Sequence, residues 1–252
     1  MKELKALLFD VDGTLADTED GHLIAFNHTF EQYGLNWSWS EELYDDLLSV
    51  TGGRERIRFY IDQYNPDFER PDDLDAFIRQ LHKDKTEYFV QLMREGGIPL
   101  RPGVKRLIQE AREQGVRLAI ATTTSPENVE ALLVSAMDPS AMSWFEVIAA
   151  GDMVPAKKPA PDVYLYALEK LGLGPDECIA LEDSGNGIRS SLGAGINTII
   201  ATNKYTHGHD FSGAVIVLDQ WGEPDQPFTV LSGDAGSSTY LDMELVRRLH
   251  AA

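Results

Sequence analysis

The chain has 252 residues, of which 43% are hydrophobic, and it carries a formal net charge of −19. This length and composition suit one sizeable α/β domain with a smaller companion. The sequence contains no stretch of 18 apolar residues, which excludes a membrane-spanning helix. The negative charge argues against a nucleic acid or an anionic membrane as a partner, because both would repel an acidic protein.

The single cysteine, Cys178, begins the apolar segment 178–181 and is interpreted as a small core residue. One cysteine allows no internal disulfide, which fits a reducing compartment. The N-terminus leads directly into a predicted strand rather than into a signal peptide. We therefore expect a cytoplasmic protein, and we expect it to be a monomer.

The first predicted strand ends in two acidic residues. Residues 4–9 are apolar except for one lysine, as in a strand that is buried on both faces of a parallel sheet. Asp10 and Asp12 follow, and a period of two directs both to the same side, while Gly13 permits a sharp turn. In open α/β sheets ligands bind beyond the carboxyl ends of the strands, so these carboxylates are candidates for chemistry. On this stretch alone, the alternative is a simple Asp-Gly turn.

Residues 17–95 show helical periodicity and no convincing strand. Apolar residues recur three and four positions apart, which predicts four helices at 22–33, 41–50, 54–64 and 72–94. Glycine and proline at 96–99 and 102–103 then punctuate the chain. Four short helices fit a small bundle inserted after the first strand. We therefore predict a helical domain at 17–95, inserted into a core domain of residues 1–16 and 96–252.

From residue 104 onward, predicted helices and strands alternate, which indicates parallel βαβ units and an α/β fold. The predicted helices are 104–114, 128–134, 161–171, 187–192 and 242–250. The predicted strands are 116–121, 147–150, 179–181, 198–201 and 215–218. Residues 219–239 are rich in Gly, Pro, Ser and Asp, and we expect an irregular surface loop there.

Two later stretches add groups that could bind phosphate. The strand 116–121 ends at Thr122, whose hydroxyl could donate to a phosphoryl oxygen; the alternative is a helix N-cap, a role that suits Thr124 or Ser125. Lys158 precedes a rigid Pro-Ala-Pro segment at the start of a helix. A lysine fixed in this way is poorly explained as a solvated charge.

A third stretch closes another buried strand with adjacent carboxylates. Glu182 and Asp183 follow the apolar strand 179–181. Without a partner they would repel each other and lose solvation. Mg²⁺, which takes oxygen ligands, resolves both costs. The alternative is ordinary surface acidity, which the preceding apolar strand disfavours.

In this order, the four stretches resemble the motifs of the haloacid dehalogenase (HAD) superfamily of phosphohydrolases. The matching residues are DVDGTL from Asp10, the threonine Thr122, KPAPD from Lys158, and EDSxxG from Glu182 to Gly187. The resemblance covers residues 4–218. It implies a Rossmann-like core with a parallel sheet and an inserted small α-helical cap.

The resemblance also implies a Mg²⁺-dependent phosphatase, a phosphoric monoester hydrolase. Asp10 would attack phosphorus to give an aspartyl-phosphate, and Asp12 would protonate the leaving oxygen and then deprotonate water. Thr122 and Lys158 would bind the phosphoryl group. The implied Mg²⁺ ligands are Asp10, the Asp12 carbonyl, Glu182 and Asp183.

Within the superfamily, the helical insertion resembles the β-phosphoglucomutase subgroup. The chain is more similar still to the CbbY-type phosphatases, which accompany the Calvin cycle and act on xylulose 1,5-bisphosphate, an inhibitory by-product of Rubisco. This resemblance lies in residues 17–19 with His22, 51–57, 85–87, 121–125 with 128–130, and 149–153. It implies substrate contacts from Asp17 (where close relatives have Glu), His22, Gly53, Arg54, Lys85 and Thr123.

Arg54 and Lys85 are the predicted partners of a second phosphate. The segment 51–54 begins a helix, where free backbone amides favour an anion, and Arg54 adds a bidentate donor. Lys85 interrupts the apolar face of the helix 72–94. The alternative is a solvated arginine and a lysine that extends its ammonium to solvent.

Two other functions stay open on the sequence. A phosphomutase would use the same core but would return the phosphoryl group to a sugar. A non-catalytic phospho-ligand sensor is disfavoured, because it predicts decay of the catalytic residues and all are present. A dehalogenase is also disfavoured, because its site lacks the second aspartate, here Asp12.

Overall fold

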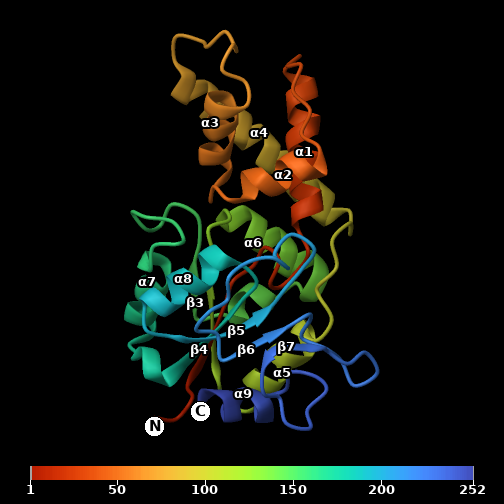
Figure 1. Ribbon diagram of the computed structural model, residues 1–252. Helices are drawn as coiled ribbons and strands as arrows, with labels where there is room; N and C mark the ends of the chain where they lie inside the picture. The colour runs from red at the N-terminus through yellow and green to blue at the C-terminus, as the bar shows by residue number, and fades with distance from the viewer. Residues whose placement is uncertain (1, 252) are drawn as a thin grey trace. The chain divides into compact units, whose positions relative to one another are not determined.

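The computed structural model describes residues 2–251. Its contacts divide the chain into two units (Figure 1). The core unit comprises the residues up to Asp17 and those from Pro99 onward, and the helical unit comprises Thr18–Ile98. The predicted boundaries lie close to these limits. That the helical unit acts as a cap stays a prediction.

The core unit contains a seven-stranded sheet in the order β3-β2-β1-β4-β5-β6-β7. All neighbouring strands are parallel except β6 and β7. The strands are β1 Ala6–Phe9, β2 Arg117–Ala121, β3 Val147–Ala149, β4 Cys178–Glu182, β5 Asn197–Ala201, β6 Ile216–Leu218 and β7 Val230–Gly233. The prediction of a Rossmann-like α/β fold with a parallel sheet is confirmed.

The central strand β1 sets the position of the site. Phe9 pairs with Ile120 of β2 on one side and with Leu181 of β4 on the other. The backbone N–H of Asp10 continues the ladder by donating to the Leu181 carbonyl at 3.0 Å. Because these parallel strands end at the same level, the residues that follow β1 and β2 and close β4 are brought to one edge of the sheet.

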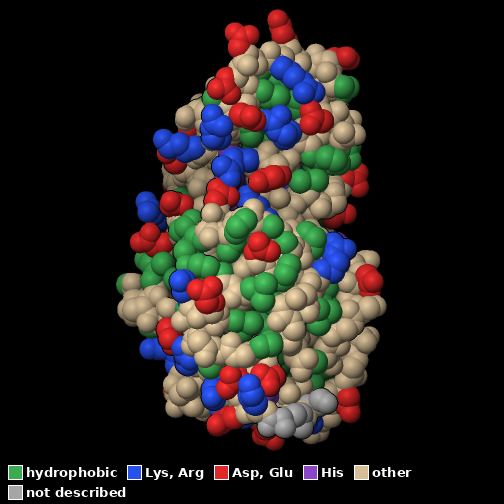
Figure 2. Space-filling view, turned by 90° about the vertical axis from the view of Figure 1, so that its left-hand side faces the viewer, with side chains coloured by type: hydrophobic (Ala, Val, Ile, Leu, Met, Phe, Trp, Pro, Cys, Tyr) green, Lys and Arg blue, Asp and Glu red, His purple; other side chains and the backbone are tan. Residues whose placement is uncertain are grey.

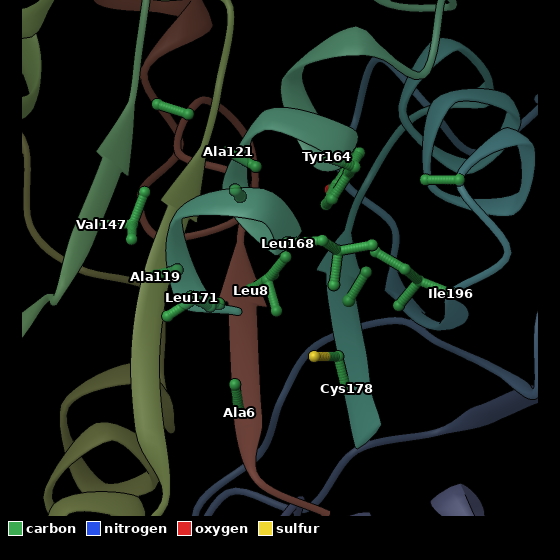
Figure 3. Packing of buried hydrophobic residues seen from close by; sticks show 14 of the residues in the cluster. Ala6, Leu8, Ala119, Ala121, Val147, Tyr164, Leu168, Leu171, Cys178 and Ile196 are labelled. Atoms are coloured by element: carbon green, nitrogen blue, oxygen red, sulfur yellow. The ribbon is translucent and has the colours of Figure 1, made fainter. Parts of the chain in front are cut away.

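Helices cover both faces of the sheet. Ala6 and Leu8 of β1 pack with the helix α7 in the cluster shown in Figure 3, whereas α5 and α9 contact β2 and β4. The period of two in a strand sends alternate residues to opposite faces. The core helices are α5 Val104–Glu113, α6 Pro126–Leu132, α7 Asp162–Leu171, α8 Gly185–Gly193 and α9 Met243–His250; shorter turns are η1 Leu133–Met137, η2 Ala141–Trp144 and η3 Pro175–Glu177.

The helical unit contains the four predicted helices: α1 Glu19–Gln32, α2 Glu41–Leu48, α3 Gly53–Gln63 and α4 Leu74–Arg94. Aromatic rings fill its interior. The Trp39 ring lies 4.6 Å from that of Phe26 and 4.9 Å from that of Phe30, between centroids. The Asn27 side chain fixes Trp39 by bonding both its N–H and its carbonyl.

The expectation of an irregular loop at 219–239 is wrong in part. Val230–Gly233 forms β7, which pairs antiparallel with β6 and extends the sheet. Trp221 is only 1% exposed. The surrounding Gly, Pro, Ser and Asp residues obscured a four-residue strand, which periodicity alone cannot identify.

On the face of the molecule that Figure 2 shows, acidic and basic side chains are interspersed. Within residues 2–251, no helix is both long and apolar enough to cross a membrane.

Candidate active site

Three carboxylates meet at the carboxyl edge of the sheet. Asp10 follows β1, Glu182 is the last residue of β4, and Asp183 comes next. Each offers an oxygen that lies within 4.8 Å of the others, and all three residues are buried. The register of β1 and β4 therefore brings together residues that are far apart in sequence.

Lys158 joins two of these carboxylates. Its Nζ lies 2.6 Å from Asp10 Oδ1 and 2.6 Å from Glu182 Oε1. Burial alone would lower the pKa of Lys158, but the two carboxylates raise it above its ordinary value, so the side chain stays charged. Three ionised carboxylates and one ammonium still leave the cluster with excess negative charge.

The surroundings of Asp10 favour its neutral form. Burial in the cluster raises the pKa of Asp10 to about 7; Lys158 opposes the shift, and Glu182 adds to it. The chain's own cation therefore does not fully stabilise the ionised Asp10. A bound cation would supply the missing positive charge.

The residues present fit a hard divalent cation. The two oxygens of the Glu182 carboxylate have different surroundings. Oε1 accepts hydrogen bonds from Lys158 and from the Tyr164 hydroxyl, each at 2.6 Å. Oε2 is buried and has no hydrogen-bond partner within residues 2–251. A Cβ on Gly187 would collide with Oε2, so glycine keeps the space beside this oxygen. An all-oxygen set of this kind suits Mg²⁺.

Two contacts to the cluster were not predicted. Tyr164, on α7, was absent from the predicted site, although a polar hydroxyl on a buried helix face is a signal of such a contact. Asn203, which follows β5, donates through Nδ2 to Asp183 Oδ2 at 2.7 Å. Both side chains hold a carboxylate in place, and neither belongs to a sequence motif.

The turn after β1 follows the predicted path. Gly13 has a φ of +78°, and a Cβ at this position would collide with the carboxylate of Asp183. Thr14 Oγ1 lies 3.4 Å from Asp10 Oδ2. Asp12 is half-buried, and its charge contributes to raising the pKa of Asp10. The carboxylate of Asp12 lies outside the group that could hold the metal; the ligand predicted from this residue is its carbonyl.

The segment after β2 places Thr122 at the same edge of the sheet. Thr122 is buried, and its N–H donates to the Ala149 carbonyl at 2.9 Å. The N-cap of α6 is Ser125, whose Oγ accepts from the Asn128 N–H. Thr122 is therefore not the helix cap, and phosphate binding stays its predicted role. Thr123 is half-buried beside it.

In the helical unit, His22 and Lys85 form a buried pair. Lys85 Nζ lies 2.6 Å from His22 Nδ1 and within 5 Å of the ring centres of Phe26 and Phe89. The His22 ring stacks on Phe89 at a centroid distance of 3.8 Å. Lys85 is 4% exposed, so the alternative that its ammonium extends to solvent is wrong.

The start of α3 adjoins the same cluster. Gly53 is the first residue of α3, and a Cβ at this position would collide with the His82 ring and lie 3.5 Å from Phe26. Arg54 follows and is half-buried. Gly53 and Lys85 therefore both border the Phe26 ring.

Asp17 belongs to the core unit rather than to this group. Its side chain is 67% exposed and lies 3.4 Å from Arg101 Nε. Its predicted substrate contact stays a prediction.

Comparison with known proteins agrees with this geometry. Residues 7–201 match the family "Haloacid dehalogenase-like hydrolase". The chain is 48% identical over 220 residues to the protein CbbY of Cereibacter sphaeroides, covering 87% of this chain and 94% of that protein. It is 40% identical over 225 residues to a CBBY-like protein of Arabidopsis thaliana, covering 88% and 70%.

Solved structures give the same result. The crystal structure of CbbY from Rhodobacter sphaeroides in complex with phosphate has a TM-score of 0.79 and 48% identity, covering 86% of this chain and 94% of that one. A β-phosphoglucomutase from Clostridium difficile, at 18% identity, shares the fold with a TM-score of 0.75. The prediction of a HAD-type phosphatase is confirmed, and the chain belongs to the haloacid dehalogenase-like hydrolases.

Proposed function

We propose that this enzyme is a Mg²⁺-dependent phosphatase that releases phosphate from a sugar bisphosphate such as xylulose 1,5-bisphosphate. The buried cluster of Asp10, Lys158, Glu182 and Asp183 carries the proposal, because it combines a nucleophile, a cation and metal ligands at one sheet edge. The similar CbbY of Rhodobacter sphaeroides supports the substrate, since its D10N mutant is solved in complex with Xylulose-(1,5)bisphosphate.

In the first half of the reaction, a carboxylate oxygen of Asp10 attacks phosphorus. The bond from phosphorus to the sugar oxygen breaks, and the leaving oxygen takes a proton from Asp12. Asp10 then carries the phosphoryl group as an aspartyl-phosphate. In the second half, Asp12 takes a proton from water as that water attacks phosphorus, which releases inorganic phosphate and restores both aspartates.

The other residues of the cluster manage charge. The Lys158 ammonium lies against Asp10 and reduces the repulsion between the nucleophile and the phosphate dianion. Thr122 would donate to a phosphoryl oxygen. When bound by Asp10, the Asp12 carbonyl, Glu182 and Asp183, Mg²⁺ would neutralise charge on the transferring group.

The second phosphate would be bound by the helical unit. The start of α3 supplies a helix N-terminus and Arg54, and Lys85 supplies a buried ammonium that borders the same Phe26 ring as Gly53. His22, Gly53, Asp17 and Thr123 are proposed as further substrate contacts. We propose that these groups couple bisphosphate binding to closure of the helical unit as a cap.

The physiological setting proposed here is the cytoplasm, where the enzyme would clear an inhibitory sugar bisphosphate associated with the Calvin cycle. Such a role requires only a small-molecule substrate, and the excess of acidic residues does not favour nucleic acid or membrane partners.

Phosphate release from a panel of sugar monophosphates and bisphosphates, with Mg²⁺ or with excess chelator, tests the proposal. We expect multiple turnovers of inorganic phosphate with a bisphosphate and Mg²⁺, and none in chelator. Isomerisation of the bisphosphate without phosphate release would establish a phosphomutase instead. Binding without turnover would establish a sensor.

Arg54→Ala tests the second-phosphate contact. The variant should lose about 2–4 kcal/mol in kcat/KM for a bisphosphate, as expected for loss of a desolvated charged contact. A small monophosphate ester, which does not reach Arg54, should react as with the wild type. Equal losses on both substrates would show that Arg54 supports the fold instead.

A further inference from the structure

The turn that follows Asp10 and Asp12 accepts hydrogen bonds from residues that are distant in the sequence. Three consecutive carbonyls, those of residues 13–15, each accept a hydrogen bond from a distant residue. Arg101 donates to Gly13 O through Nη1 and to Leu15 O through its backbone N–H. Trp221 donates through Nε1 to Thr14 O at 2.9 Å. Both donors are almost fully buried.

Arg101 also connects this turn to two other segments. Its guanidinium donates to the carbonyls of Ala201 at 3.0 Å and Thr202 at 2.6 Å, where β5 ends. It donates further to the carbonyl of Asp219 at 3.2 Å, just before Trp221. The guanidinium lies 6.0 Å from the centre of the Trp221 ring. The turn, the end of β5 and the residues near 221 are therefore one hydrogen-bonded assembly.

The Trp221 backbone is itself fixed. Its carbonyl accepts from the Leu241 N–H at 2.7 Å. Arg106 of α5 donates to the next carbonyl, that of Gly222, at 2.8 Å and bonds Glu223 Oε2 at 2.6 Å. These hydrogen bonds fix the backbone around Trp221 and thereby the position of its indole N–H beside Thr14.

Hydrogen bonds within the turn engage the N–H groups of residues 13–15, whereas the carbonyls of these residues accept from the outside donors. Gly13 separates Asp12 from Thr14 and has the positive φ that glycine adopts readily. A catalytic group retains its efficiency only if its geometry is held closely. Asp12 lies two residues before Thr14. If the Thr14 carbonyl can move, Asp12, the proposed proton donor, can move with it. Loss of its donor would also leave a buried carbonyl without a hydrogen bond, which destabilises this conformation of the turn.

We propose that Trp221 is a positioning residue of the active site, whose indole N–H, together with Arg101, holds the turn 13–15 and thereby keeps Asp12 in place for proton transfer. The inference rests on the proposed function, because it assumes that Asp12 protonates the leaving oxygen. It assigns a role to the C-terminal segment 219–250, beyond the residues that match the family.

The role makes a prediction about leaving groups. An alkoxide leaves phosphorus only with a proton from the general acid, whereas p-nitrophenolate, a weak base, leaves without one. Benzyl phosphate and p-nitrophenyl phosphate are similar in size and differ in this respect. Disturbing Asp12 should slow the first more than the second. A loss of folded enzyme would reduce both rates by the same factor.

The experiment compares kcat/KM for these two esters in the wild type, in Trp221→Phe and in the control Trp144→Phe. The ratio does not depend on the concentration of active enzyme, and kcat/KM excludes the later hydrolysis of the aspartyl-phosphate. Trp144 is a matched control, since its Nε1 also donates a hydrogen bond, to Ser140 Oγ at 3.2 Å, in the same unit.

We expect Trp221→Phe to lose about tenfold on benzyl phosphate and less than about twofold on p-nitrophenyl phosphate, a fraction of a general acid's full effect. The control should keep the wild-type ratio. An unchanged ratio in Trp221→Phe, whether both rates fall or neither does, would overturn the inference. A wild type that released phosphate neither from these esters nor from a sugar bisphosphate would overturn the proposed function as well.

If Trp221→Phe does not fold, 3-benzothienylalanine at position 221 keeps the shape of the indole and removes only its N–H. The same change in the ratio is expected. A wild-type ratio with this side chain would show that Trp221 acts through packing alone, and would reject the positioning role.

Discussion

Two lysines are almost fully buried, and their surroundings differ. Lys158, in the core unit, lies 2.6 Å from two carboxylates, those of Asp10 and Glu182. Lys85, in the helical unit, lies 2.6 Å from a ring nitrogen of His22 and faces two phenylalanine rings. One ammonium is held by anions of the chain, and the other contacts an imidazole and aromatic faces.

The difference separates two tasks. Carboxylates fix Lys158 at one point and keep it charged beside Asp10, the proposed nucleophile, which suits every phosphate ester that reaches Asp10. Lys85 borders the same Phe26 ring as Gly53 at the start of α3, in the unit where the second phosphate is proposed to bind. We therefore propose that the cluster around Lys158 serves catalysis and that the cluster around Lys85 serves selection of the substrate.

The largest effect is expected from a variant that loses catalysis and keeps substrate binding. Asp10→Asn removes the nucleophile and should reduce phosphate release by at least about 10³-fold. The helical unit is unchanged, so binding of the bisphosphate, measured by calorimetry with Mg²⁺, should persist. Phosphate release above a trace would mean that another group is the nucleophile.

Lys158→Met tests the catalytic lysine. We expect a loss of about 10²–10³-fold in kcat/KM on monophosphates and bisphosphates alike, because the ammonium serves the reacting phosphate. Without Mg²⁺ the variant should lose about 3–5 kcal/mol of unfolding free energy, since Asp10 and Glu182 keep their burial and lose their partner. Denaturant unfolding with and without Mg²⁺ measures this. A variant as stable as the wild type in chelator would contradict the ion-pair account.

Tyr164→Phe sharpens the description of the core cluster. The hydroxyl holds Glu182 Oε1, and Oε2 is the oxygen proposed to bind the metal. Its removal should weaken Mg²⁺ binding by about tenfold or more, the effect typical of a lost partner to a metal ligand. Calorimetric titration with Mg²⁺ measures the affinity. Tyr166→Phe, on the same helix and half-buried, should bind Mg²⁺ as the wild type does; equal weakening in both variants would assign the effect to α7 rather than to the hydroxyl.

The comparison also shows what the sequence can reveal. Asp10, Glu182 and Asp183 lie at strand ends, which the order of parallel strands brings together, and Lys158 lies in the loop between β3 and α7. Four short motifs were enough to predict their proximity. Asp10, Lys158, Glu182 and Asp183 were named in this way. The contact between Lys85 and His22 depends on how α1 packs on α4, which periodicity does not determine.

Three other residues that support the site belong to no sequence motif. Tyr164, Asn203 and Trp221 each meet the site through a single polar atom that comes from a distant part of the chain. Trp221 lies in a stretch whose composition indicated a surface loop. Its side chain is buried at the turn 13–15, where it donates to Thr14, and no short-range pattern of the segment indicates this contact. Supporting contacts of this kind follow from tertiary packing and become visible only in the structure.

The division between the two lysines is tested most directly by one ratio: kcat/KM for a sugar bisphosphate divided by kcat/KM for a small monophosphate ester. In Lys158→Met both values should fall and the ratio should stay within about twofold of that of the wild type. In Lys85→Met, where methionine can pack between Phe26 and Phe89, the ratio should fall about tenfold through loss of the bisphosphate reaction alone. If Lys85→Met reduced both reactions equally, the separation of catalysis from selection would be contradicted.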